Sequence, residues 1–312
     1  MSSIITDVVI GVFFTTLNYA PLLIFAGLGE IVAEKSGVVN LGIEGLMLMG
    51  AFTTYSLDLL TGNPWVGLFG SLVVAAIIGG VFSFITIGLY LDQIVSGLGV
   101  YLFGLGFSYV LYDLFTRSGH IGSFRNISPV FIPFVSDIPV VGKILFQQNV
   151  LVYLSLILVP AVAYFLRRTS LGLRIRAVGE NPKAADNMGI NVKKTRFMAV
   201  MFGSLMAGLA GAYFEFGFLQ SFQFNIILGR GFVALAMIYF ANWSPYRLLF
   251  VALVYEIVDA LQSEIVSLGG PLFQTSSQLF NMLPYVFVLA LIPVFGRKAR
   301  APKYLTVPYK KG

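Results

Sequence analysis

The side chains best suited to chemistry in this sequence are carboxylates that interrupt long apolar runs. Glu256 and Asp259 are three positions apart, so on a helix they share a face and repel each other unless one is protonated or a cation intervenes. Such a pair could serve acid–base catalysis, but no nucleophile accompanies it. The chain has no cysteine and one histidine, His120, which argues against thiolate and histidine-rich metal sites. We therefore expect no catalytic residues, no metal site and no enzyme activity.

A second polar pair lies in a glycine-rich stretch, where Asn40 and Glu44 are one helical turn apart and could share a face. Ionisable groups at membrane depth are costly and usually face a cavity or a partner. The pair therefore has two interpretations of equal weight. One is a polar wall of a solute path, and the other is a helix cap with a buried hydrogen bond between helices. Phe222 and Asn225 are further path candidates, because an aromatic ring and an amide could hold a ring-shaped solute, although packing at the lipid interface also explains Phe222.

The composition indicates the elements that must position these groups. Hydrophobic residues make up 57% of the 312 residues, charged residues only 11%, and the mean hydropathy is +0.87. A soluble domain usually carries about 25% charged residues. Long apolar helices in a bilayer account for the difference. The sequence therefore predicts an all-α polytopic integral membrane protein.

The apolar runs set the number of helices. A spanning helix needs about 20 mostly apolar residues, and nine runs approach that length. We expect about 8–10 transmembrane helices, including possible re-entrant segments; 226–242 is short and begins with Gly229-Arg230-Gly231, as a partial helix would. The nine runs are 8–29, 41–60, 66–91, 94–115, 149–166, 196–218, 226–242, 246–266 and 279–296.

Basic residues are concentrated in two segments beside apolar runs. Eight lie between 167 and 196, and six lie in the tail 297–312, out of 20 in the whole chain. Positive charge beside membrane spans marks the cytoplasmic side. We therefore expect the loop 167–195 and the carboxyl terminus to be cytoplasmic. Nucleic-acid binding is not indicated, since no basic domain exists outside these flanks.

The basic loop contains signals for a short helix. Asn181 suits the N-cap, Pro182 the first helical position and Gly189 the position after the helix. About seven residues remain, roughly 10 Å of helix, which is marginal in water without packing partners. An ordinary solvated loop is the alternative. Small apolar side chains fall on one predicted face, which suits insertion into a shallow groove: Ala184, Ala185 and Met188.

The segment Gly179-Glu180-Asn181-Pro182, followed by Ala184-Ala185 and Gly189-Ile190, resembles the coupling loop of membrane permeases in ATP-binding-cassette importers. The closest group is the branched-chain amino acid, ribose and nucleoside permeases. The stretch 34–48 resembles the amino-terminal signature of the nucleoside and simple-sugar branch, and 92–98 and 229–236 also match. The likeness runs in order from about residue 20 to 296. Related chains more often continue with a glycine and a basic residue where this one has Tyr239–Trp243.

The resemblance implies one transmembrane permease domain, 1–312, that transports a small polar solute by alternating access. It implies partner chains: cytoplasmic ATP-binding subunits, a second identical or homologous permease and an extracytoplasmic substrate-binding protein. ATP and Mg²⁺ would be bound by the partner ATPase, and no cofactor by this chain, which lacks a phosphate-binding loop. The location implied is a prokaryotic inner cell membrane, crossed many times.

The resemblance also assigns roles to residues. Residues for ATPase coupling are Gly179, Glu180, Asn181, Pro182, Ala184, Ala185, Met188 and Gly189. Candidates for the solute path are Asn40, Glu44, Gln93, Ser96, Phe222 and Asn225. The expected solute is a nucleoside; one alternative is a ribose-like sugar, and another is an ion-coupled secondary transporter that uses Glu44, Glu256 or Asp259.

Overall fold

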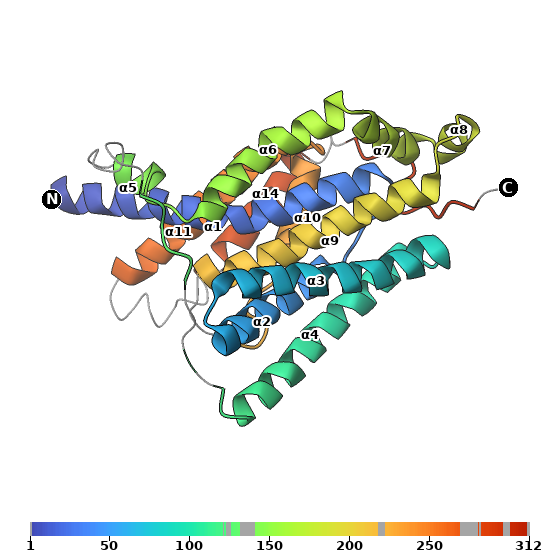
Figure 1. Ribbon diagram of the computed structural model, residues 1–312. Helices are drawn as coiled ribbons and strands as arrows, with labels where there is room; N and C mark the ends of the chain where they lie inside the picture. Colours follow the sequence, from blue (N-terminus) through green and yellow to red (C-terminus); the bar gives the residue numbers. More distant parts are fainter. Residues whose placement is uncertain are drawn as a thin grey trace.

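The computed structural model describes residues 2–120, 122, 126–131, 141–217, 222–268, 280, 282–295 and 300–310. These residues form helices and connecting turns, together with one isolated β-bridge between Pro129 and Asn149 (Figure 1). The elements are α1 (Ser2–Lys35), α2 (Ile43–Thr61), α3 (Pro64–Ser83), the π-helical turn η1 (Phe84–Gly88), α4 (Gln93–Arg117), α5 (Val141–Leu145), α6 (Val150–Arg168), α7 (Ser170–Glu180), α8 (Pro182–Asn187), α9 (Val192–Gly217), α10 (Arg230–Phe240), α11 (Pro245–Leu268) and α14 (Leu283–Phe295).

Each of the nine predicted apolar runs contains a helix, which confirms the all-α polytopic fold. Five stretches in the described part of the chain are long and apolar enough to cross a membrane, in α1, α3 with η1, α4, α6 and α9. The helix α2 carries the buried carboxylates Glu44 and Asp58, and most of its residues are buried among other helices. Helix α10 has only 11 residues, about 16 Å, so it is the partial helix that the run 226–242 predicted.

Glycines allow the central helices to touch backbone to backbone. A methyl group added to Gly104 of α4 would lie 2.5 Å from the backbone of Gly45 in α2. One added to Gly50 would lie 2.8 Å from the carbonyl oxygen of Gly208 in α9. In lipid, helix association depends on such close packing because the hydrophobic effect is weak there. Glycines therefore set the close packing of α2 against α4 and α9 at these positions.

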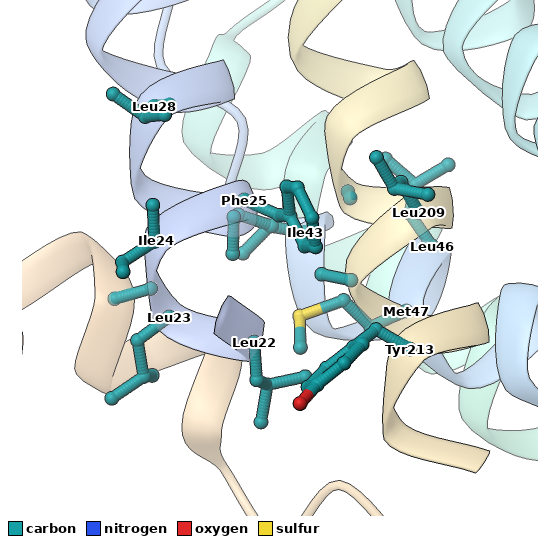
Figure 2. Close-up of a cluster of buried hydrophobic side chains, with 14 of the residues drawn as sticks. Leu22, Leu23, Ile24, Phe25, Leu28, Ile43, Leu46, Met47, Leu209 and Tyr213 are labelled. Carbon is teal, nitrogen blue, oxygen red and sulfur yellow. The ribbon is translucent and has the colours of Figure 1, made fainter. Parts of the chain in front are cut away.

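The core lies where α1, α2 and α9 meet. Figure 2 shows side chains of α1, including Leu22 and Phe25, facing Met47 of α2 and Tyr213 of α9. The rings of Phe25 and Tyr213 meet edge to face, with centroids 6.1 Å apart. This apolar centre fixes α2 against its neighbours and so positions Glu44, which follows the first residue of α2.

The basic segments lie together at one end of the molecule. Helices α7 and α8 and the carboxyl end of the chain lie at one end in Figure 1, and the amino terminus and α5 lie at the other. Loop 167–195 and the described part of the tail, 300–310, therefore lie at the same end of the molecule, and α5 lies at the other. Arg297, Lys298 and Lys311 of the predicted tail lie outside the described residues.

Candidate coupling surface and solute path

Helix α8 has the caps that its sequence predicts. The side-chain oxygen of Asn181 accepts a hydrogen bond from the Ala184 amide at 3.0 Å, and Pro182 occupies the first helical turn. At the other end, Gly189 has φ +79, and the Ile190 amide donates to the carbonyl oxygen of Ala185 at 3.0 Å. A positive φ followed by this backbone bond is the usual glycine-ended helix terminus. The short helix is therefore specified by its own residues.

A small apolar cluster supports α8 from beneath. Ala185 packs with Val178 of α7 and Val192 of α9, and is only 4% exposed. The predicted common face of Ala184, Ala185 and Met188 is thus divided, because the flanking helices cover Ala185 alone. Ala184 is exposed, and Met188 is 83% exposed. Met188 is therefore an exposed apolar side chain at the end of a supported helix, where a partner could contact it.

The remaining predicted coupling residues join α8 to the rest of the protein. A methyl group on Gly179 would overlap the carbonyl oxygen of Lys35, so α7 ends in direct contact with the end of α1. Pro182 is buried, whereas Glu180 is exposed. The loop is therefore an extension of the transmembrane bundle and not a detached arm.

The carboxyl-terminal residues 300–310 form a strap across this end of the bundle. The Tyr304 amide donates to the carbonyl oxygen of Gly179 at 2.9 Å. The Thr306 amide donates to the carbonyl oxygen of Gly37 at 3.2 Å. These bonds join the end of α7 to the turn between α1 and α2. The sequence predicted only a charged tail, because its pattern contains no signal for such pairing.

Two side chains complete the strap. Arg196 of α9 is buried, and its guanidinium donates to the carbonyl oxygens of Ser36 at 3.1 Å and Val307 at 3.0 Å. The Tyr309 hydroxyl donates to the Asp186 carboxylate of α8 at 3.1 Å. Burial and this hydrogen bond raise the pKa of Tyr309, so its hydroxyl keeps the proton that it donates. Arg196 is thus a structural residue and does not belong to the exposed basic surface.

Glu44 holds the amino-terminal end of α10. Its two carboxylate oxygens accept hydrogen bonds from the amides of Gly229 and Gly231, each at 2.7 Å. The first amides of a helix lack partners within the helix and carry partial positive charge, so a carboxylate there satisfies both needs. Of the two interpretations of Glu44, the geometry matches the helix cap with a buried hydrogen bond between helices.

Arg230 of α10 pairs with an acidic residue of α11. Its guanidinium forms an ion pair with Asp259 at 3.2 Å, and both side chains are largely buried. It also acts electrostatically on Glu256, which is fully buried one turn earlier. A cation is therefore paired with one of the two carboxylates, whereas the Glu256 oxygens have no hydrogen-bond partner among the described residues. Among the described residues, no group of three or more acidic, histidine or cysteine side chains could hold a metal ion.

Asn40 and Gln93 hold the turn that leads into α2. The Gln93 side-chain oxygen accepts from the Val39 amide at 2.9 Å. The Asn40 oxygen accepts from the Gly42 amide at 2.9 Å, in a turn before the helix begins at Ile43. The predicted shared helix face of Asn40 and Glu44 is therefore wrong, because Asn40 is not helical. Its buried amide nitrogen has no hydrogen-bond partner among the described residues.

The other path candidates have contacts within the protein. Phe222 is 1% exposed, and its ring lies 5.6 Å from Phe52 and 5.1 Å from Tyr112 between centroids, so it belongs to an aromatic cluster and not to a lipid surface. Asn225 is partly exposed in the turn before α10, with φ +52. The Ser96 hydroxyl donates to the backbone oxygen of Asp92 at 2.6 Å.

The segment Tyr239–Trp243, where this sequence differs from the pattern of related chains, forms the turn between α10 and α11. The Trp243 indole is 2% exposed and donates to the Glu34 carboxylate of α1 at 2.6 Å. Asn242 and Trp243 both have positive φ, and the Asn242 side chain accepts from the Arg300 amide at 2.9 Å. Asn242 and Trp243 therefore adopt the left-handed backbone conformation that glycine adopts more easily. Their side chains connect this turn to α1 and to the strap.

Comparison with known proteins shows which chains are similar to this one. The model of the branched-chain amino acid transport system permease component matches residues 12–292. A guanosine ABC transporter permease protein of Bacillus subtilis, NupQ, is 37% identical, with 95% of each chain covered. A nucleoside ABC transporter permease protein of Lactococcus lactis, NupC, is 33% identical, also with 95% of each covered. TsgC13 of Haloferax volcanii, provisionally assigned as a glucose ABC transporter permease, is 35% identical over 90% of each chain.

No solved structure matches the chain significantly. The family match and the three relatives extend over nearly all of the helices described above, including the α8 loop and the Glu44–α10 contact. The chain therefore belongs to the permease-component family of the branched-chain amino acid transport system, whose members are the membrane subunits of ABC transporters.

Proposed function

We propose that this chain is the permease subunit of an ATP-driven importer of nucleosides in a prokaryotic cell membrane. The observation that carries the proposal is the likeness to the guanosine and nucleoside permeases, which covers 95% of the chain in both cases. This coverage leaves little of the molecule outside the comparison. The sugar-related protein of Haloferax volcanii is also similar, so a simple sugar is the second candidate solute.

In this proposal, α8 docks a cytoplasmic ATP-binding subunit. Its support comes from geometry: the helix is capped at both ends, packed from beneath by Ala185 and tied to the strap through Asp186, while Met188 is open to solvent. A short helix that is packed against its neighbours transmits a displacement better than a flexible loop does. Binding of ATP and Mg²⁺ to the partner would favour one access state, and the coupling free energy would pass through α8 to α7 and α9.

The solute path, in this proposal, passes beside the amino-terminal end of α10. A partial helix with a non-helical approach is tolerated at membrane depth only within protein or beside an aqueous cavity. Asn225 is partly exposed in that approach, and the buried Asn40 amide has a donor to offer if the neighbouring helices separate. Glu44 would act as a positioning residue that holds α10, and not as a direct ligand.

Uptake by the reconstituted transporter tests the proposed solute. The permease, a homologous or second identical permease, the ATPase and the extracytoplasmic binding protein would be placed in vesicles with labelled guanosine, uridine or glucose. We expect ATP-dependent accumulation of nucleosides that excess unlabelled glucose does not reduce. Accumulation of glucose alone would move the assignment to the sugar branch.

An ion-coupled transporter is the competing class of function. Of its three candidate groups, Glu44 is occupied by the α10 amides and Asp259 by Arg230. The third, Glu256, is buried, and its carboxylate oxygens have no hydrogen-bond partner among the described residues, so Glu256 is the group that this class of function would use. Dissipating the proton and sodium gradients with ionophores while ATP is supplied separates the classes. Uptake that continues supports the ATP-driven importer, and uptake that collapses supports the ion-coupled class.

The coupling role of α8 has its own test. Replacing Met188→Ser removes an exposed apolar contact without disturbing the cluster beneath the helix. We expect unchanged permease stability, together with roughly tenfold weaker binding of the ATP-binding subunit, which is the effect of losing a central apolar contact. Replacing the exposed Met282, which lies outside α8, is the control. Equal ATPase binding by both variants would exclude Met188 from the interface.

A further inference from the structure

A large cavity in the described part of the chain lies beside the coupling loop and not at the α10 site. It has a volume of about 850 Å³ and lies where α1, α6, α7 and α9 meet. Its inner walls are apolar, with Val32 from α1, Leu158 and Phe165 from α6, and Phe202 from α9. A cavity of this volume can take a large ligand.

The walls lie within membrane-spanning helices. The cavity is lined by α6 from Leu158 to Phe165, seven positions or about 10 Å along the helix axis. Ala161 and Met198 line it and are exposed, so it opens sideways at the depth of the apolar spans. A water-soluble protein docked on α8 would not reach that depth, whereas an acyl chain of the bilayer lies at it.

The outer rim is cationic. Arg174 of α7 and Lys194 of α9 line the cavity, and none of its lining residues is acidic. Both side chains are exposed, and neither forms an ion pair with another described residue. The amide of Asn191 offers a further polar group beside them. Basic groups at the cytoplasmic end of an apolar slot between membrane helices provide the complement of an anionic lipid head group.

We propose that this cavity binds an anionic phospholipid, with its phosphate between Arg174 and Lys194 and an acyl chain in the slot between α6 and α9. The rim also includes Met188 and Gly189 at the end of α8. A bound lipid would therefore contact the coupling loop from its membrane side and stiffen it. This inference depends on the location of the chain in a membrane and not on which solute it carries.

Retention of lipid by the purified full-length permease tests the charge requirement. Native mass spectrometry would compare phosphatidylglycerol with phosphatidylcholine of identical acyl chains. The wild type should prefer phosphatidylglycerol, and the double variant Arg174→Gln/Lys194→Gln should lower that preference about 25-fold, about fivefold for each charge. The control Arg247→Gln/Lys303→Gln removes one arginine and one lysine from exposed positions outside this cavity and should keep the preference.

A second variant tests the slot itself. Ala161→Trp fills the lateral opening and leaves every charge in place, so retention of phosphatidylglycerol should fall severalfold. Normal retention of phosphatidylglycerol in Ala161→Trp would overturn the proposal. An equal loss of preference in Arg174→Gln/Lys194→Gln and in the control Arg247→Gln/Lys303→Gln would also overturn it. Since the chain has no cysteine, Ala161→Cys also gives a single attachment point for a cross-linker. Cross-linking to the ATP-binding subunit in place of lipid, in the assembled transporter, would likewise overturn it.

Discussion

Two short helices, α8 and α10, differ in where their caps come from. The α8 cap is local: Asn181 accepts the amide of Ala184, three residues later. The α10 cap is distant: Glu44 accepts the amides of Gly229 and Gly231, which are 185 and 187 residues away in sequence. Yet both helices have a glycine with φ near +80 at one end, Gly189 after α8 and Gly229 before α10.

The difference indicates that the two helices depend on different parts of the protein. The caps of helix α8 come from its own segment, although a helix this short is marginal in water until it packs on α7 and α9. Helix α10 acquires its cap only when α2 is in place. A displacement of α2 would therefore act directly on α10, whereas the caps of α8 would survive the same displacement.

The largest expected effect comes from removing the distant cap. Glu44→Ala leaves the part-buried amide of Gly229 and the buried amide of Gly231 without their partner, and each such group costs about 1–3 kcal/mol. We expect the permease to lose about 3 kcal/mol or more of stability, measured as thermal unfolding in detergent. Glu44→Gln keeps one accepting oxygen and should fall between the wild type and Glu44→Ala.

The control for Glu44 is Asp113→Ala, which removes a carboxylate from an exposed ion pair with Arg117 on α4. An exposed pair of this kind contributes about 0–1 kcal/mol. If Glu44→Ala destabilised the permease no more than Asp113→Ala does, the distant cap would not be what holds α10.

The two glycines allow the comparison to be sharpened. Chain neighbours aside, no atom of the described residues lies within 4 Å of where a methyl group would be at Gly189 or Gly229, so the cost of an alanine there is that of its left-handed backbone. That conformation costs about 1–2 kcal/mol. We expect Gly189→Ala and Gly229→Ala to lower stability by similar amounts in the same unfolding assay. A much larger loss for Gly229→Ala would show that its turn has a role beyond its backbone conformation.

The smallest effect is expected at the local cap. Asn181→Ala should destabilise α8 by about 1 kcal/mol, the usual value for an N-cap. Hydrogen exchange of the Ala184 amide should quicken accordingly, while exchange in α10 stays unchanged. Asn181→Asp keeps the accepting oxygen and should behave as the wild type does; faster exchange in both variants would exclude capping as the reason.

The same contrast explains what the sequence could predict. The caps of α8 and the short length of α10 depend on nearby residues, and both predictions are confirmed. The partner of Glu44 could not be identified, because a carboxylate in an apolar run fits a solute path and a helix cap equally well. The assumption that α2 was helical from Asn40 also failed, since the asparagine side chain forms a turn with Gly42.

Contacts made by the strap were equally beyond prediction. Tyr304 and Thr306 pair through backbone amides, whose partners do not depend on side-chain identity. Arg196 was counted among the basic residues of the loop, and the structure shows that it is buried. The sequence could not predict this, because a basic residue at the end of a membrane span has the same sequence context whether its side chain is buried or exposed. Proposed roles for the coupling and path residues remain predictions that the variants above address.

The strap also has a consequence for the order in which the protein is made. Residues 304–309 leave the ribosome after every helix that they contact, so their bonds to Gly179, Gly37 and Asp186 form last during synthesis. The membrane bundle can thus assemble while the surface around α8 still lacks its final support. Synthesis of the strap and readiness of that surface for a partner subunit are thereby linked in time, which disfavours assembly with chains that still lack the strap.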